Sequence, residues 1–313
     1  MKAWPMFALV FACGGDPPGE VDARPIGPDA DLGTDIAAVP EGCTTERATE
    51  DRPDDHRYDQ IRVLYVTSAD GPDLGHDTSG KICNSIRAVA TWFHEQSGAY
   101  LRFDTAGGLV DIGFLRLART DAEMAGSDPS NTSVATGHAF VRERIEQGLG
   151  LLAPNKMYAV FYEGTSVYAC GGGPWPPLLV GRVGAIYLQA TPTGVATPCG
   201  DVYPWGQGDL VPHYVDYAVL HELVHGLGLA PATAPHQHTT GHVYDAAAPQ
   251  PNRDLMYSER PGMPDPPWGT ELPGGLILDI GDDDYFNAPT PFDLASSSII
   301  APLSPFAHRP PGW

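Results

Sequence analysis

Positive charge is scarce in this sequence of 313 residues. Its 18 Lys and Arg are outnumbered by 39 Asp and Glu, which gives a formal net charge of -21 and a pI near 4.6. No basic arm or cluster of Lys and Arg interrupts this acidic excess. Such a chain repels a phosphate backbone, because nucleic-acid binding depends on neutralising phosphates with cationic side chains. We therefore expect no nucleic-acid partner.

Long apolar runs are missing beyond the N-terminus, so no membrane-spanning helix is expected. Lys2 precedes the apolar residues 3–12 and Cys13 follows them directly, a pattern typical of an export signal. Residues 10–13 (Val-Phe-Ala-Cys) are similar to a bacterial lipobox, in which the Cys is acylated. We predict a signal over residues 1–13 with a lipid anchor at Cys13 as the sole membrane contact, an ordinary secretory signal being the alternative. Both place the protein outside the cytoplasm, in the bacterial cell envelope (periplasm or surface) or secreted.

Cysteine is rare as well, and no Cys-x-x-Cys spacing supports a Cys-based metal site. Once Cys13 is set aside, an even number remains in an exported chain, which predicts two disulfides. Three pairings are possible. Proximity in the sequence favours Cys43 with Cys83 and Cys170 with Cys199.

Large apolar side chains are few in residues 14–55, which contain 12 Asp and Glu, 3 Lys and Arg, and many Pro and Gly. A segment of this composition cannot bury enough surface to fold alone. We interpret it as an acidic, Pro/Gly-rich linker that leads to one catalytic domain over residues 56–313.

The pattern of apolar residues within the domain alternates between strand and helix periods. This alternation predicts an α/β (α+β) fold with a mixed or mostly parallel twisted sheet. After Gly228 little regular pattern remains, so we expect an irregular, loop-rich C-terminal subdomain. The predicted strands cover residues 61–67, 100–104, 110–117, 157–162 and 184–189, and the predicted helices cover 81–96 and 134–147, with a further helix before Gly228.

That further helix carries His221-Glu222-x-x-His225. Residues four apart lie on one helix face, so the two imidazoles can reach one metal ion at the ~2.0–2.1 Å that zinc prefers. Glu222 lies about 100° around the helix axis from His221. It is therefore a candidate base for a metal-held water and not a ligand.

The motif resembles that of the metzincin metallopeptidases, zincins in which a Gly follows the second His by three residues and a Met-turn lies beneath the zinc. Here Gly228 fills the first position, and Asp254-Leu255-Met256-Tyr257 provides the turn. The resemblance extends over about residues 60–300. It implies one catalytic zinc, a sharp turn at Gly228 and Met256 as the floor of the site.

The third ligand departs from the metzincin pattern, since its usual position is occupied by Pro231, which cannot bind metal. Residues 232–242 offer His236, His238 and His242. We favour His242, because the segment from His242 to Met256 is similar to the short segment between third ligand and Met-turn in matrixins, here lengthened by several residues. The main alternative is His236, followed by His238 or Asp245.

These residues predict a zinc-dependent endopeptidase that acts on a protein or peptide, with Glu222 moving the proton. An extended substrate would pair with residues 184–189 if these form the edge strand. Two alternatives stay open: an inactive zincin-fold surface lipoprotein that binds a protein or glycan, and a zinc amidase acting on cell-wall peptide. Calcium binding by Asp279 and 282–284 lacks the EF-hand spacing, so a structural acidic turn is favoured.

Overall fold

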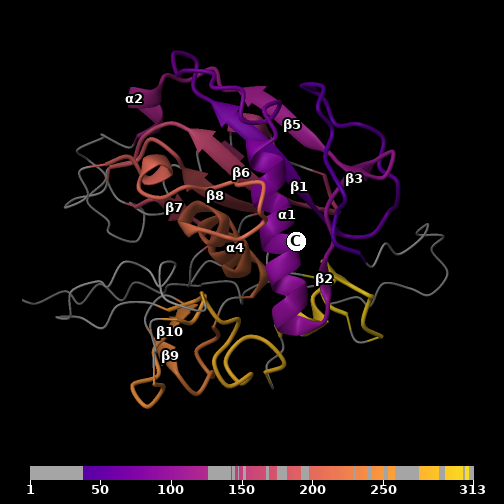
Figure 1. The fold of residues 1–313 in the computed structure, drawn as a ribbon, viewed down its shortest axis with the longest axis vertical. Coiled ribbons are helices and arrows are strands. Elements are labelled where there is room, and N and C mark those ends of the chain that lie inside the picture. Colours follow the sequence, from indigo (N-terminus) through magenta and orange to yellow (C-terminus); the bar gives the residue numbers. More distant parts are fainter. Residues whose placement is uncertain are drawn as a thin grey trace, which may run out of the picture.

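The computed structural model describes the greater part of the domain, and a mixed sheet forms its centre (Figure 1). The described residues are 38–125, 142, 145–146, 148–150, 153–166, 169–174, 182–191, 197–228, 230–238, 241–249, 253–257, 275–288, 293–305 and 307–309. Cys13 and the predicted signal over residues 1–13 lie outside them.

The sheet has five strands in the order β5-β1-β6-β8-β7. The first four run parallel to one another, whereas β7 pairs antiparallel with β8 and forms one edge. This confirms the predicted α/β (α+β) class with a mostly parallel sheet. In that order, the strands are Ile112–Arg116, Gln60–Thr67, Lys156–Glu163, Val183–Tyr187 and Gly171–Gly172.

Two long helices, α1 (Lys81–Ser97) and α4 (Tyr214–Leu227), pack on one face of the sheet. Side chains alternate along a strand, so β1 sends Ile61, Val63 and Tyr65 toward these helices and its other apolar residues to the opposite face. Every residue of β1 and β6 is buried, as expected for inner strands of a parallel sheet covered on both faces. The sheet therefore forms a rigid platform for α4.

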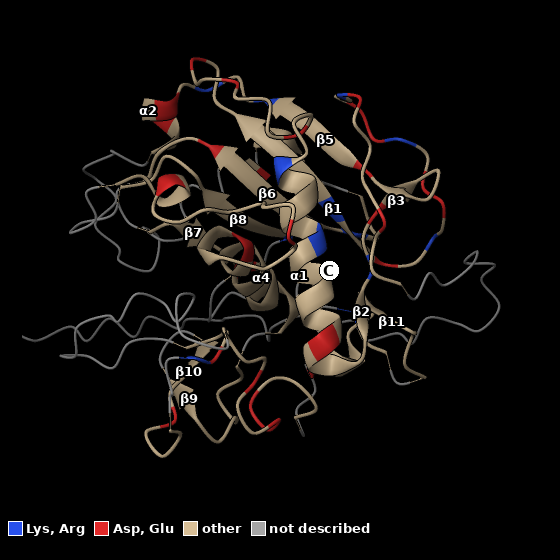
Figure 2. Cartoon of the chain, viewed as in Figure 1, with Lys and Arg blue, Asp and Glu red and all other residues tan. Residues whose placement is uncertain are grey.

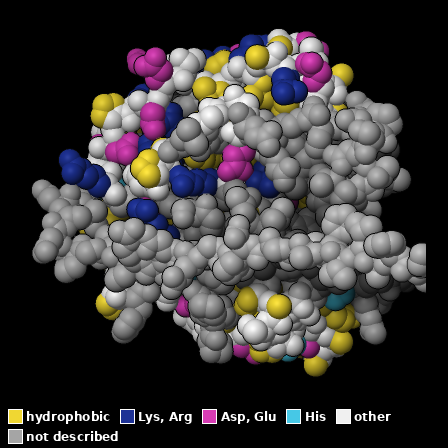
Figure 3. All heavy atoms as spheres, turned by 180° about the vertical axis from the view of Figure 1, so that it is seen from behind, with side chains coloured by type: hydrophobic (Ala, Val, Ile, Leu, Met, Phe, Trp, Pro, Cys, Tyr) yellow, Lys and Arg dark blue, Asp and Glu magenta, His cyan; other side chains and the backbone are white. Residues whose placement is uncertain are grey.

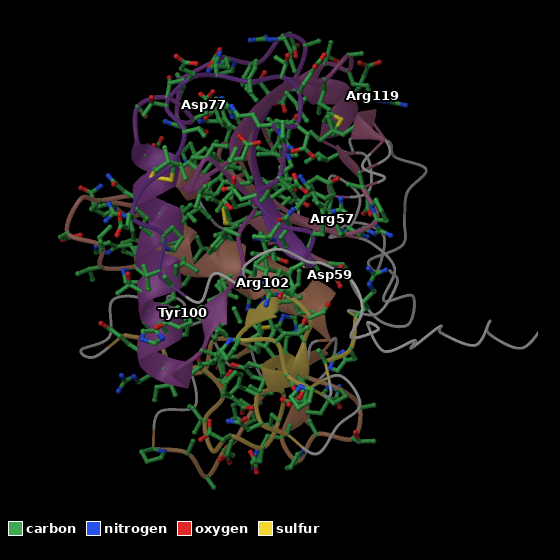
Figure 4. All side chains as sticks on the ribbon, turned by 90° about the vertical axis from the view of Figure 1, so that its right-hand side faces the viewer. Arg57, Asp59, Asp77, Tyr100, Arg102 and Arg119 are labelled. Atoms are coloured by element: carbon green, nitrogen blue, oxygen red, sulfur yellow. A yellow bond between two sulfur atoms is a disulfide. The ribbon has the colours of Figure 1, made fainter. Side chains whose placement is uncertain are left out.

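The remaining elements are short: α2 (Asp121–Met124), η1 (Cys199–Asp201), η4 (Leu294–Ser296), β2 (Tyr100–Leu101), β3 (Thr105–Ala106), β4 (Leu109–Val110), β9 (Gln237–His238), β10 (His242–Val243) and β11 (Ile300–Ala301). Arg102, which follows β2, donates hydrogen bonds to the carbonyls of Asp59 and Ile300 and so ties the C-terminal segment to the sheet (Figure 4).

Residues 38–55 were expected to belong to a solvated linker, but they lie against the sheet. The backbone of Thr44 and that of Ala48 hydrogen-bond to β4 and β5, respectively, and Cys43 forms a disulfide with Cys83 of α1. Composition alone predicted a linker because the segment has few apolar side chains. A covalent bond and backbone pairing can order such a segment without them.

Most other predicted strands are confirmed within a few residues, but one placement was wrong. The predicted edge strand, 184–189, corresponds to β8, which lies between β6 and β7. The true edge, β7, lies in a glycine-rich stretch that lacks the apolar alternation by which strands are recognised. The predicted helix over 134–147 falls mainly outside the described residues.

Several of the few cations form ion pairs with carboxylates, and Lys156 is the most buried of those described. Lys156 Nζ lies 2.7 Å from carboxylate oxygens of Asp51, Asp54 and Asp104. Acidic residues occur in many of the described loops (Figure 2), and the view from behind shows Lys and Arg beside an acidic side chain near the middle of that face (Figure 3). The charge of Lys156 is thus neutralised within the fold.

No described helix is long and apolar enough to cross a membrane. The second predicted disulfide, Cys170 with Cys199, is also present. Two disulfides indicate a protein that folds outside the reducing cytoplasm.

Candidate metal centre

Helix α4 is fixed at both ends. Buried Asp216 accepts hydrogen bonds from the backbone N–H groups of His213 and Gly206, at 2.8 and 3.1 Å, which caps the N-terminus. The helix ends at Gly228, whose φ of 147° is a conformation that residues with a side chain rarely adopt. Between these ends, four apolar side chains at helical spacing are buried in the core: Leu220, Leu223, Val224 and Leu227.

Three histidines converge beside this helix. The Nε2 atom of His221 lies 3.1 Å from that of His225 and 3.2 Å from that of His242, and the latter two atoms are 3.2 Å apart. Ligand nitrogens around a tetrahedral zinc lie about 3.3 Å from one another, given Zn–N bonds of ~2.0–2.1 Å. The three nitrogens therefore fit a small tetrahedral cation.

The protonation state of His221 and His225 also favours the binding of a cation. Burial lowers the pKa of His221 to about 4 and holds the pKa of His225 well below its ordinary value. Both imidazoles are therefore neutral at pH 7, the form that binds metal. His221 Nδ1 lies 2.7 Å from the carbonyl oxygen of Leu255, so that nitrogen donates its proton and leaves Nε2 with a free lone pair.

His242 reaches the centre from a small hairpin. Strands β9 and β10 pair antiparallel, with His238 opposite His242. The N–H of Val243 donates to the carbonyl of Met256 at 2.9 Å, which fastens the hairpin to the segment beneath α4. Of the candidates named for the third position, His242 is the one that the fold brings to His221 and His225.

His236 and Asp245 belong to a different group. His236 Nδ1 lies 3.0 Å from Asp284 Oδ2, and its backbone N–H donates to Asp284 Oδ1 at 2.8 Å. Its other ring nitrogen lies 3.8 Å from Asp245. These contacts bind the hairpin to the acidic turn after Asp279, whose carboxylate accepts from backbone N–H groups of the turn. The carboxylates of Asp279 and Asp284 thus hold the turn and the hairpin together.

Glu222 lies beneath edge strand β7. A Cβ atom added to Gly171 would come within 2.6 Å of Glu222 Oε1, and one on Gly173 within 2.7 Å of His225 Cβ. The N–H of Gly173 hydrogen-bonds to the carboxylate of Glu222, while burial raises the pKa of Glu222 to about 8. A cation on the histidines would favour the ionised carboxylate and lower that value.

Sequence reasoning missed the glycine-rich strand that covers Glu222. The only sequence signal for this strand was the run of glycines after Cys170, because glycines in a strand often mark a place where another part of the chain approaches the backbone closely. Sequence reasoning named Asp254 only as the first residue of the turn and gave no role to its carboxylate, which is buried and contacts residues distant in the sequence. Met256, two residues further along the chain, is fully buried.

Comparison with known proteins adds little. No protein-family model matches the sequence, and no curated protein is similar to it. A crystal structure of wild-type OgpA from Akkermansia muciniphila aligns with 84% of this chain and 66% of that chain, at 13% identity and a TM-score of 0.37. This chain therefore spans about two thirds of the length of that one. An alignment of this quality carries no conclusion about function.

Proposed function

We propose that the chain is a zinc-dependent peptidase whose metal is held by His221, His225 and His242. The convergence of their three Nε2 atoms to 3.1–3.2 Å is the observation that carries the proposal. Neutral imidazoles in a tetrahedral arrangement are typical zinc ligands, and three protein ligands leave a fourth position for water or substrate, as in catalytic sites.

Glu222 acts as the base and then as the acid. When bound, zinc supplies a Lewis acid that acidifies water and polarises the scissile carbonyl. The carboxylate of Glu222 accepts a proton from that water and delivers it to the leaving amine. The N–H of Gly173 keeps the carboxylate in place, because a hydrogen bond to its charged form restrains both its position and its ionisation.

The substrate binds as an extended chain along the outer edge of β7. Its backbone would extend the sheet by pairing with Gly171–Gly172, which lies directly over Glu222. Pairing through the backbone imposes little selection on side chains, so the class of substrate is protein or peptide. A place in the metzincins, with Met256 as the Met-turn residue, is part of the same proposal.

Metal analysis and a cleavage assay test this function. The purified protein is expected to bind about one zinc per chain and to cleave an unfolded protein such as reduced casein. A chelator should abolish cleavage, and zinc should restore it. Zinc binding without cleavage of any peptide would favour the binding lipoprotein, whereas cleavage confined to cell-wall peptide would favour the amidase. A protein that binds no zinc would contradict the proposal outright.

The two disulfides offer a matched test of how β7 positions Glu222. Cys170 precedes Gly171 directly and is bonded to buried Cys199. Cys170→Ala/Cys199→Ala should lower kcat by about 10–100-fold with zinc content unchanged, because a base displaced by about 1 Å loses activity of that order. Assays of kcat and zinc content on the double variant check this.

The control is the removal of the other disulfide, Cys43→Ala/Cys83→Ala, which lies away from Glu222. The bridges join residues 29 and 40 positions apart, so loop entropy predicts similar losses of stability for the two variants, about 2–5 kcal/mol each. Only the bridge next to β7 should affect kcat at temperatures where both variants are folded. Equal losses of kcat would show that stability alone is responsible.

A further inference from the structure

Three donors converge on the carboxylate of Asp254, a buried residue that precedes the segment beneath α4. Its Oδ1 accepts from the N–H of Met256 at 2.7 Å and from the hydroxyl of Tyr285 at 3.0 Å. Its Oδ2 accepts from the N–H of Ile280 at 2.7 Å. Asp254 therefore fixes the start of the turn and joins it to the C-terminal acidic loop.

The two residues that follow Asp254 reach two of the candidate ligands through their carbonyl oxygens. Leu255 accepts from Nδ1 of His221 at 2.7 Å. Met256 accepts from the N–H of Val243, the neighbour of His242, at 2.9 Å. This short turn therefore sets the orientation of the His221 imidazole on α4. It also sets the position of the hairpin that carries His242.

We propose that Asp254 is a positioning residue of the metal centre, because it holds the carbonyls of Leu255 and Met256 where they orient His221 and place His242. This inference rests on the proposed metal centre. It extends that centre to a residue that is not among the converging ligand atoms of His221, His225 and His242.

A carboxylate suits this position better than an amide. The hydroxyl of Tyr285 accepts from the N–H of Asp279 at 2.8 Å, so its own proton points to Asp254. All groups facing Asp254 are thus donors, and an acceptor-only side chain satisfies every one. In Asp254→Asn, the amide NH₂ would face the N–H of Ile280 or displace one of the other two donors.

Metal binding by the full-length protein tests the inference. Asp254→Asn is expected to weaken zinc binding by about 10–100-fold, the usual cost of losing a residue that orients a metal ligand. Tyr285→Phe removes one of the three bonds and should weaken binding in the same direction but less. In the cobalt-substituted protein, both changes should alter the visible absorption bands that report ligand geometry. In the metal-free protein, the Nδ1 proton of His221 should exchange faster.

Asp59→Asn is the matched control. Asp59 is a carboxylate of equal burial, 2% exposed like Asp254, and it accepts hydrogen bonds from the hydroxyl of Ser298 and from the guanidinium of Arg309. These contacts lie outside the turn and the acidic loop, so its replacement should lower thermal stability and leave zinc affinity within about twofold.

Each outcome decides a separate question. An unsubstituted protein that binds no zinc overturns the metal centre and the inference together. If the unsubstituted protein binds zinc and Asp254→Asn or Tyr285→Phe binds it equally well, the inference alone is wrong. It is also wrong if Asp59→Asn weakens binding as much as Asp254→Asn, because a general loss of stability would then explain the weaker binding.

Discussion

His242→Ala is expected to abolish stoichiometric zinc binding, whereas His236→Ala leaves the metal in place. His242 Nε2 lies 3.2 Å from Nε2 of both His221 and His225, so its loss leaves two nitrogens for the ion. The fall in affinity should exceed the roughly 10–100-fold typical of residues that only orient a ligand. Competition with a chelator of known zinc affinity measures it, and peptidase activity should fall in parallel.

His238→Ala provides the control, because His238 lies opposite His242 in the same hairpin. It tests whether loss of any histidine there disturbs the hairpin enough to release zinc. His236→Ala removes the contact with Asp284 and should lower stability without changing zinc stoichiometry. Zinc retention by His242→Ala together with zinc loss in His236→Ala would reverse the assignment of the third ligand.

The first two proposed ligands and the proposed base could be identified from sequence because one helix carries all three. His221 and His225 are four residues apart, and helix geometry alone puts them on one face. For the proposed third ligand the sequence left three histidines and Asp245 as candidates, because Pro231 occupies the expected position. Its choice depends on hairpin pairing between β9 and β10, which are two residues each and leave no periodic signal.

The fold class followed from strong local patterns. β1 and α1 are long, with apolar residues at strand and helix spacing, and both were predicted within one residue at each end. Edge strand β7 consists of glycines without side chains, so its place depends on the disulfide at Cys170 and on contact with Glu222. The sequence placed Asp254 in the turn but could not predict the contacts of its carboxylate, because its partner Tyr285 lies 31 positions away.

Glu222→Gln is expected to retain one zinc per chain and to lose peptidase activity by about 10²–10⁴-fold, the usual contribution of general acid–base catalysis. Gln has nearly the same shape as Glu, and its carbonyl oxygen can still accept the N–H of Gly173. It cannot take up a proton at neutral pH. The fall should therefore appear in kcat, with KM changed little, because the backbone edge of β7 that would hold the substrate is intact.

Glu222→Asp separates the loss of proton transfer from the loss of position. It keeps a titratable carboxylate but shortens the side chain by one methylene, so the oxygens withdraw from Gly173. We expect partial activity, between that of the Glu222→Gln variant and that of the unchanged protein, because a base about 1 Å from its proper place still transfers protons at a reduced rate. Zinc content should be equal in all three proteins, since Glu222 contributes no atom to the group of converging ligands.

Two outcomes would contradict the role of Glu222. Full activity in Glu222→Gln would mean that another group moves the proton, and zinc loss in that variant would make Glu222 part of the metal centre itself.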